Sequence, residues 1–249
     1  MSLSVVIITL NEEANLARTL ASVAWADEII VLDSGSTDRT REVAESFHAR
    51  FFVEPWKGFA AQKNSALEQA TCDWVLSLDA DEEVEPALAE EIQAVLAANA
   101  SVGGYWVPRK NFFLGRWIKH GGFYPDPKLR LFRRGAGNFE DRLVHEDLKL
   151  AGATASLKNN LLHHAYPTLA SYLEHMNRYS SLGAEMVAAT RPQGFSLIDI
   201  VLRPKFTFLY NYVLRGGFLD GREGLLLHAY HATYVSWKYA KAWEISRHP

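Results

Sequence analysis

The sequence lacks the features that mark disulfide-bonded, zinc-finger and nucleic-acid-binding proteins. It contains one cysteine, Cys72, in 249 residues, which excludes an internal disulfide and a cysteine-based zinc cluster. Lys and Arg number 26 against 29 Asp and Glu, so the net charge of −3 creates no general attraction for nucleic acid. We therefore expect a protein of a reducing compartment with no nucleic-acid partner.

Long apolar runs are also missing. Residues 1–8 contain no basic segment followed by a long apolar one, which predicts the absence of a signal peptide and a cytoplasmic location. No stretch approaches the roughly 20 apolar residues that a membrane-spanning helix needs, so any membrane contact is expected to be peripheral. With 48% hydrophobic and 22% charged residues, the chain can nevertheless bury one substantial core.

Short apolar runs alternate with segments of helical spacing in the first hundred residues. The runs at 5–8, 28–32, 51–53 and 74–78 are rich in β-branched and aromatic residues and predict buried strands. The segments between them, and one that follows Pro86, repeat apolar residues at helical intervals. This alternation predicts an α/β fold with a mostly parallel sheet flanked by helices.

The pattern changes after the first hundred residues. Short β-like pieces at 105–108, 129–132 and 155–157 predict a smaller α+β region over residues 101–192. Helical spacing starts at Thr168, and residues 193–249 form an aromatic, basic tail that we expect to be helical.

Polar residues follow three of the predicted strands, in the loops 9–13, 33–38 and 79–82. Ligands of an open parallel sheet bind outside the carboxyl ends of its strands, so these loops are expected to share one crevice. Asp33 and Asp79 end apolar strands, where an unpaired carboxylate is costly unless a ligand binds it. A base edge, a ribose hydroxyl or a metal-bound diphosphate could be the ligand that binds these carboxylates. Helix capping explains Asn11 and Asp38 equally well.

Asp79 and Asp81 supply two hard oxygen ligands directly after a buried strand, which favours Mg²⁺ or Mn²⁺ bridging to phosphates. Neither a G-x-G-x-x-G motif after the first strand nor a P-loop motif occurs in the sequence. This excludes the usual dinucleotide dehydrogenases and P-loop enzymes.

This order of motifs resembles the family 2 glycosyltransferases, which have the GT-A fold. The resemblance covers the loops at 9–12, 33–38 and 78–82 together with Gln62-Lys63-Asn64. It implies an inverting, metal-dependent glycosyltransferase whose donor is a nucleotide-sugar, with a UDP-sugar as the favoured candidate. It also implies that residues 1–100 form the nucleotide-sugar-binding half. The resemblance implies the following site: Asp33 against the nucleobase, Thr9, Leu10, Asn11, Glu12, Ser36 and Lys63 lining the nucleotide, Asp81 on the metal, and Asp79 at the ribose or sharing the metal.

The second half is similar to the lipopolysaccharide core branch of that family, the β-1,4-glucosyltransferase-like enzymes. The matching stretches lie at 128–133, 144–146, 162–163, 177–179 and 217–221. They imply that residues 101–192 are the acceptor-side, catalytic half of the same domain. The implied acceptor is a lipid-linked saccharide of the lipopolysaccharide core or of another surface glycan.

An inverting transfer needs a carboxylate that takes the proton of the attacking hydroxyl. Glu146 follows an apolar pair and is the favoured base, with Asp141 as the alternative; Glu146 could instead be a surface acid. His163 is either a further metal or diphosphate contact or a structural residue. Arg130 and Arg133 are three residues apart on a predicted strand, so only one of them can face the site.

Other interpretations remain open on the sequence alone. A nucleotidyltransferase shares the architecture but usually has a glycine- and arginine-rich first loop, which this chain lacks. A nucleotide- or glycan-binding module without catalysis is a third possibility. From Arg203 to Leu219, large aromatics alternate with basic residues, which predicts either packing on the catalytic domain or docking at the inner face of the inner membrane.

Overall fold

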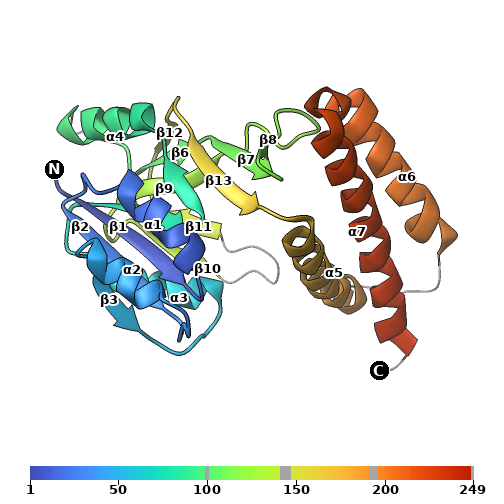
Figure 1. The fold of residues 1–249 in the computed structure, drawn as a ribbon, viewed down its shortest axis with the longest axis horizontal. Helices are drawn as coiled ribbons and strands as arrows, with labels where there is room; N and C mark the ends of the chain where they lie inside the picture. Colours follow the sequence, from blue (N-terminus) through green and yellow to red (C-terminus); the bar gives the residue numbers. More distant parts are fainter. Residues whose placement is uncertain (99–100, 141–146, 191–195, 248–249) are drawn as a thin grey trace. The chain divides into compact units, whose positions relative to one another are not determined.

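A computed structural model describes residues 1–98, 101–140, 147–190 and 196–247 (Figure 1). The chain packs as two units. Unit one comprises Met1–Arg109 and Asp126–His163, and unit two comprises Lys110–Pro125 and His164–Pro249. The segment 110–125 thus leaves the first unit, packs with the carboxyl-terminal helices and returns.

Unit one is built on a seven-stranded sheet with the order β12-β6-β9-β4-β1-β2-β3. Four strands at one side are parallel, as the alternating pattern predicts: β1 (Leu3–Thr9), β2 (Glu28–Asp33), β3 (Arg50–Val53) and β4 (Trp74–Asp79). The other side is mixed, because β9 (Lys128–Arg133) runs antiparallel to β4 and to β6 (Gly104–Val107), and β12 (Thr154–Ser156) is parallel to β6.

Helices cover both faces of this sheet. Val5 and Ile7 of β1 pack in one core cluster with Leu16 of α1 (Glu13–Ser22) and Leu88 of α4 (Pro86–Ala98). Val6 points to the opposite face, into a second cluster that contains part of α3 (Phe59–Glu68). Successive side chains of a strand alternate between faces, so a strand covered on both sides must be apolar throughout. That explains the continuous apolar runs in the sequence, and α2 (Thr40–Ser46) completes the predicted helices.

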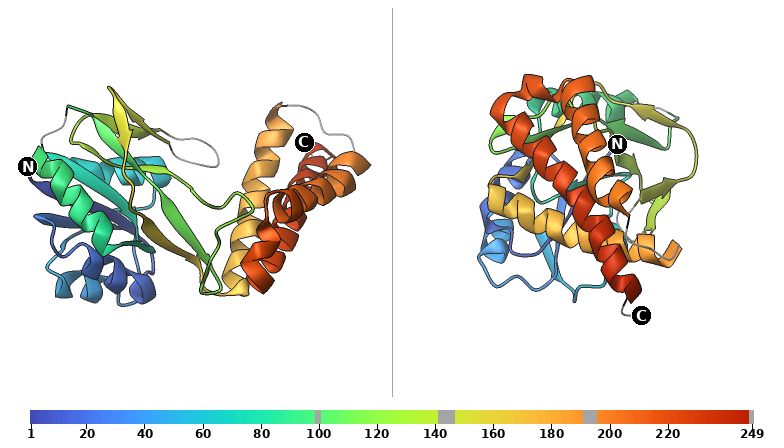
Figure 2. Two further views of the ribbon diagram at one scale, coloured as in Figure 1. Left: turned by 90° about the horizontal axis from the view of Figure 1, so that it is seen from above. Right: turned by 90° about the vertical axis from the view of Figure 1, so that its right-hand side faces the viewer.

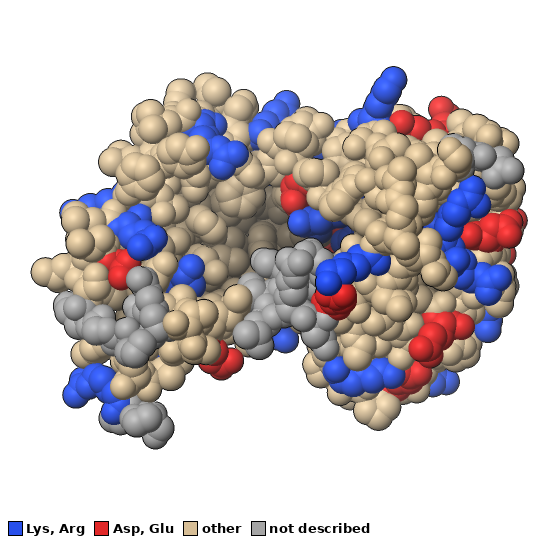
Figure 3. Space-filling view, turned by 180° about the vertical axis from the view of Figure 1, so that it is seen from behind, with Lys and Arg blue, Asp and Glu red and all other residues tan. Residues whose placement is uncertain are grey.

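Two small antiparallel pairs complete unit one. β5 (Glu82–Val84) pairs with the first half of β13 (Leu161–Tyr166), and β10 (Gly137–Glu140) pairs with β11 (Asp147–Leu150). Asn64 of α3 holds the second pair, because its amide donates to the carbonyl of Phe139 at 2.9 Å and accepts from the Phe139 N–H at 2.8 Å. On the face of unit one at the right of Figure 3, acidic and basic side chains are interspersed.

Unit two is mainly helical. Its long helices α5 (Leu169–Thr190) and α7 (Gly221–Arg247) pack side by side (Figures 1 and 2). A continuous helical run precedes α7 and consists of η1 (Ile198–Leu202), α6 (Arg203–Phe208) and η2 (Leu209–Leu214), followed by the short η3 (Gly217–Asp220). The segment 110–125 contributes most of β7 (Arg109–Phe113), β8 (Arg116–Trp117) and the core residue Phe113.

The expected α/β architecture and the helix starting near Thr168 are confirmed. The packing units do not follow the three segments expected from the sequence, since residues 110–125 pack with the carboxyl-terminal helices. Those segments divide the chain by role, and their roles stay a prediction. Among the described helices, none is both long and apolar enough to cross a membrane.

Candidate active site

Asp33 closes a tight loop at the carboxyl end of β2. One carboxylate oxygen accepts hydrogen bonds from the hydroxyls of Thr9 (3.0 Å) and Ser36 (2.5 Å), and the other accepts from the N–H groups of Gly35 and Ser36 (both 2.7 Å). Gly35 has a φ of 99°, which residues with a Cβ rarely adopt and which lets the backbone turn toward the carboxylate. Asp33 is only 2% exposed, so its charge is stabilised by these four donors.

The loops after β1 and β2 are joined by Asn11. Its backbone N–H donates to the Ser36 hydroxyl at 2.7 Å, and its side-chain oxygen accepts from the N–H of Thr37 at 2.9 Å. Asn11 has a φ of 57°, in the left-handed region that asparagine tolerates. The capping interpretation therefore does not hold for Asn11, whose side chain bonds to the loop after β2 instead of to its own helix.

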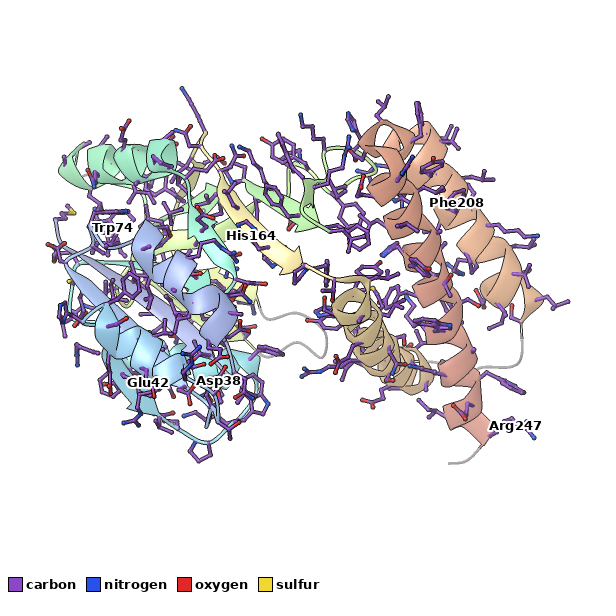
Figure 4. The ribbon with its side chains drawn as sticks, viewed as in Figure 1. Asp38, Glu42, Trp74, His164, Phe208 and Arg247 are labelled. Carbon is purple, nitrogen blue, oxygen red and sulfur yellow. The ribbon has the colours of Figure 1, made fainter. Side chains whose placement is uncertain are left out.

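Asp38, labelled in Figure 4, does act as a cap. Its carboxylate accepts from the N–H of Thr40, where α2 begins, at 3.0 Å, and from the N–H of Glu13, where α1 begins, at 3.1 Å. The amino-terminal ends of two helices thus share one carboxylate. Such ends have free N–H groups and a partial positive charge, which makes them natural surroundings for an anion.

Asp79 at the end of β4 is paired with two cations. Lys63 Nζ lies 2.9 Å from one of its oxygens, and Arg130 hydrogen-bonds to the other. Burial alone would raise the pKa of Asp79, but the positive charges of Arg130 and Lys63 outweigh it and hold the pKa well below its ordinary value. Lys63 itself is buried and lies over the ring of Phe139, 5.3 Å from its centroid.

Both Asp33 and Asp79 therefore have partners within the protein, so their burial does not by itself require a ligand. Asp33 is satisfied by hydroxyl and backbone donors, and Asp79 by two basic side chains. The proposed roles of the two residues in ligand binding are separate from this point and stay predictions.

Glu82, at the start of β5, links Asp79 to a longer series of ion pairs. It is completely buried and accepts from Arg130 at 2.6 Å, from Arg109 at 2.9 Å and from the backbone N–H of Asp79 at 3.0 Å. Arg109 also binds Asp126 at 2.7 Å. Desolvation opposes ionisation of Asp126, but Arg109 and Lys128 lower its pKa to about 2. Acidic and basic groups thus alternate from Lys63 to Asp126.

We call these residues, namely Lys63, Asp79, Arg130, Glu82, Arg109 and Asp126, the ionic chain. The sequence predicts Asp79 and Lys63 as site residues, but it gives no comparable prediction for Glu82, Arg109 and Asp126. The available signal was Glu82 itself, an acid two positions before Val84 and therefore on the same face of a strand as this apolar residue. The expectation that only one of Arg130 and Arg133 reaches the site is confirmed, because Arg130 joins the ionic chain and Arg133 lies over the ring of Trp74.

Asp81 differs from Asp79, the other acid of the 79–81 motif. Among the described residues, no Lys or Arg side chain lies within salt-bridge distance of Asp81. Its carboxylate lies 3.3 Å from Nε2 of His163. The strand register explains this approach, because His163 is paired with Glu82, the neighbour of Asp81. Burial opposes ionisation of Asp81, and His163 lowers its pKa. The structure therefore places His163 beside Asp81, and the predicted metal-binding roles of both residues stay predictions.

Negative charge accumulates around Asp81. Burial raises the pKa of Glu12, and the charges of Asp81, Asp38 and Asp79 raise it further, against a hydrogen bond from Asn15. Carboxylates from three loops are therefore close enough for Asp81, Asp38 and Asp79 to repel Glu12. Among the described residues, no three His, Cys, Asp or Glu side chains are grouped as a complete metal site. The carboxylates of Asp79 and Asp81 nevertheless fit Mg²⁺ or Mn²⁺. These cations usually bind proteins through one or two carboxylates and take their other ligands from phosphates and water.

The structure thus brings most of the sequence-predicted residues to one edge of the sheet. Thr9, Asn11, Ser36 and Asp33 form one hydrogen-bonded group, and the group of Lys63, Asp79, Asp81 and His163 lies at the adjacent strand ends. Leu10 is half exposed beside them. The two candidate bases, Asp141 and Glu146, lie outside the described residues.

An open sheet with a hydrogen-bonded acidic loop after its second strand and an Asp-x-Asp motif after its fourth is the arrangement of a GT-A glycosyltransferase. The family model for glycosyl transferase family 2 matches residues 4–157, more than half of the chain. The chain belongs to this family and is a glycosyltransferase.

Known relatives extend the likeness beyond the matched segment. The lipopolysaccharide core biosynthesis glycosyltransferase LpsC of Rhizobium meliloti is 33% identical over 253 residues, covering 98% of this chain and 93% of LpsC. An uncharacterized glycosyltransferase of Rickettsia typhi, RT0209, is 29% identical over 90% of this chain and 80% of its own length. The crystal structure of S. aureus TarS 1-349 in complex with UDP has a TM-score of 0.50 at 18% identity, over 99% of this chain and 91% of that one, a likeness of fold.

Proposed function

We propose that this enzyme transfers a sugar, with inversion, from a UDP-sugar to a lipid-linked saccharide of the lipopolysaccharide core or of another surface glycan. The observation that carries this proposal is the position of Asp81 at the end of β4, amid acidic side chains and beside His163. A relative of nearly equal length is named for lipopolysaccharide core biosynthesis, and TarS has been crystallised with UDP and with UDP-GlcNAc. A cytoplasmic location, with the acceptor at the inner face of the inner membrane, accords with this chemistry.

The nucleoside would bind at the group around Asp33. A carboxylate has about four lone-pair positions, and Asp33 already uses them for two hydroxyls and two N–H groups. The hydroxyls of Thr9 and Ser36 can rotate, so an N–H on a base edge could replace one of them at little cost. Leu10, Asn11 and Glu12 would line the same pocket, and Asp79 would lie toward the ribose.

The diphosphate would bind at Asp81, with Lys63 and His163 nearby. Asp79 is already held by Lys63 and Arg130, which leaves Asp81 as the principal protein ligand for Mg²⁺ or Mn²⁺, with Asp79 and His163 as secondary candidates. When bound, the cation would stabilise the negative charge of the departing diphosphate. The ionic chain would keep Asp79 ionised and in place, because three of its members, Lys63, Arg130 and Glu82, are almost completely buried.

The acceptor hydroxyl must lose its proton on the face of the sugar opposite the diphosphate. We propose Glu146 as the base, with Asp141 as the alternative. Both belong to the sequence between β10 and β11, the pair that Asn64 ties to α3.

The proposed function is tested by measuring release of UDP from a panel of UDP-sugars, with Mn²⁺ and with excess chelator, in the presence of a truncated core oligosaccharide. Asp81→Asn should abolish metal-dependent turnover. Asp73→Asn is the matched control, because Asp73 precedes the opposite end of β4 and bonds to Ser2. Full activity in chelator or in Asp81→Asn would disprove the metal assignment. Diphosphate release from a nucleoside triphosphate would indicate a nucleotidyltransferase, and UDP binding without turnover a binding module.

A further inference from the structure

The outward face of the helical run η1-α6-η2 in unit two is apolar. Ile198, Leu202, Phe206, Leu209 and Val213 follow one another at intervals of three or four residues, and each is between 49% and 66% exposed. We call this row the apolar face. Surface helices of globular proteins normally carry polar residues on the side that faces water, so an apolar row of this length needs an explanation.

The inward side of the same run is already used by α7. Pro204 is buried there, the hydroxyl of Ser236 donates to the carbonyl of Ile200 at 2.9 Å, and Arg203 lies over the ring of Tyr239. Phe208, labelled in Figure 4, lines a groove of about 590 Å³ between the run and α7. Leu209 of the apolar face borders this groove, whereas its other four residues do not line it. Internal packing therefore leaves most of the apolar face exposed.

The apolar surface continues beyond the helix. Leu214 is 74% exposed, and Phe218, which follows the glycine turn at Gly216, is 51% exposed. The exposed aromatic rings of Phe206 and Tyr210 stack at 5.9 Å. Aromatic side chains with one apolar and one polar end are favoured at the level of lipid headgroups.

The charges beside the apolar face are of one sign. Within the described residues 196–222, the exposed charged side chains are basic and include Lys205 and Arg215. The two acids of this segment are turned inward: Asp199 pairs with Arg203, and Asp220 is buried against His120. A second copy of the chain would bring like charges together at this surface, whereas anionic lipid headgroups would complement them.

We propose that the apolar face, with Lys205 and Arg215 at its border, docks on an anionic lipid bilayer. The apolar side chains enter the boundary between headgroups and acyl chains, and the two cations bind the headgroups. The helical run lies in the plane of the interface, as amphipathic peripheral helices do. This surface belongs to unit two alone and is independent of the sugar donor and acceptor.

The test is flotation of the full-length protein with vesicles of phosphatidylcholine, alone or mixed with phosphatidylglycerol. The wild type should float with the anionic vesicles at low salt, be released by high salt, and stay unbound with pure phosphatidylcholine. K205S/R215S should bind about 30-fold more weakly, since each cation near an anionic surface contributes roughly fivefold. F206S/L214S should lose at least about tenfold through the apolar area withheld from the membrane.

Matched controls come from unit one. Val53→Ser removes an apolar residue that is 51% exposed, and R39S/R41S removes two exposed cations. These variants should bind vesicles like the wild type. Circular dichroism checks each fold, and Phe206→Ser and Leu214→Ser are compared singly if the double variant loses helicity.

Two results would overturn docking on lipid. One is a wild type that never floats with anionic vesicles, or an F206S/L214S variant that floats as well as the wild type. The other is a wild-type dimer by light scattering that F206S/L214S converts to a monomer while vesicles stay unbound. That second result would make the apolar face an interface between copies of the chain.

Discussion

Arg130 and Glu82 form an ion pair in the interior of unit one, with 2.6 Å between Nη2 and Oε1 and side chains that are 6% and 0% exposed. Arg130 comes from β9, which runs antiparallel next to β4, and Glu82 from the short strand that follows the Asp-x-Asp motif. Burial opposes the charge of Arg130, but Asp79 and Glu82 raise its pKa above the ordinary value. The pair thus anchors the residue that begins the motif.

Removing one member of this pair should destabilise the protein strongly. Glu82→Gln leaves Arg130 and Arg109 without their shared carboxylate, and breaking a buried pair in this way costs about 3–5 kcal/mol. The free energy of unfolding in urea measures this loss. Glu83→Gln is the control on the same strand, because its side chain is 30% exposed and its ion pair with Arg18 spans 3.7 Å. Equal effects of both substitutions would show that the ionic chain adds nothing to stability.

Asp33→Ala should weaken UDP binding by about 1.5–3 kcal/mol, the range for hydrogen bonds to charged groups. It should also lower the melting temperature, because four donors in the loop lose their acceptor. Calorimetric titration with UDP measures the first effect. Asp27→Asn is the control, since Asp27 precedes the opposite end of β2 and accepts from the N–H of Leu3. A lower melting temperature with unchanged UDP affinity would restrict Asp33 to a structural role.

Glu146→Gln should lower kcat by two or more orders of magnitude and leave UDP affinity nearly unchanged, because the amide keeps the shape of the side chain but cannot take a proton. Steady-state kinetics at saturating donor and acceptor measure kcat, and calorimetry measures UDP binding. Asp141→Asn serves as the paired variant. If Asp141→Asn loses kcat and Glu146→Gln does not, the base is Asp141.

His228 should make unit two sensitive to acid. The residue is buried, and neither ring nitrogen has a hydrogen-bond partner among the residues that the structure describes. Burial and the charges of His231 and Arg215, against the opposing effect of Asp220, lower its pKa to about 4. Above pH 6.5 His228 is neutral in both states and changes nothing. Below pH 6.5 the unfolded state binds a proton that the folded state does not, so stability falls until about pH 4.

The free energy of unfolding falls by roughly 3 kcal/mol in total, because the pKa of His228 is about 4 in the folded state and 6.5 in the unfolded state. Urea unfolding at a series of pH values from 7 to 4, for the wild type and His228→Phe, separates this residue from other titrating groups. The wild type should lose more stability than His228→Phe over that range. Parallel curves would show that His228 does not cause the acid sensitivity.

The strands and helices of unit one were predictable from local pattern. A strand covered on both faces needs apolar residues at every position, and the runs that become β1, β2 and β4 satisfy this without help from distant residues. The end of each strand then places Asp33, Asp79 and Asp81 at one edge of a parallel sheet. Periodicity and strand order thus predicted the fold and the positions of these three acids in the candidate site.

Tertiary structure decided which partners these acids have. Arg109 and Glu82 are separated by 27 positions and Arg130 and Asp79 by 51, so no local pattern records that they meet. Only the reversal of β9 against β4 brings Arg130 to Asp79, and only the β5–β13 register brings His163 to Asp81. Helix exposure was likewise undecided by sequence. Apolar residues in the run 198–214 could pack inward or face outward, and contact with α7 buries Pro204 but leaves Leu202 and Phe206 exposed.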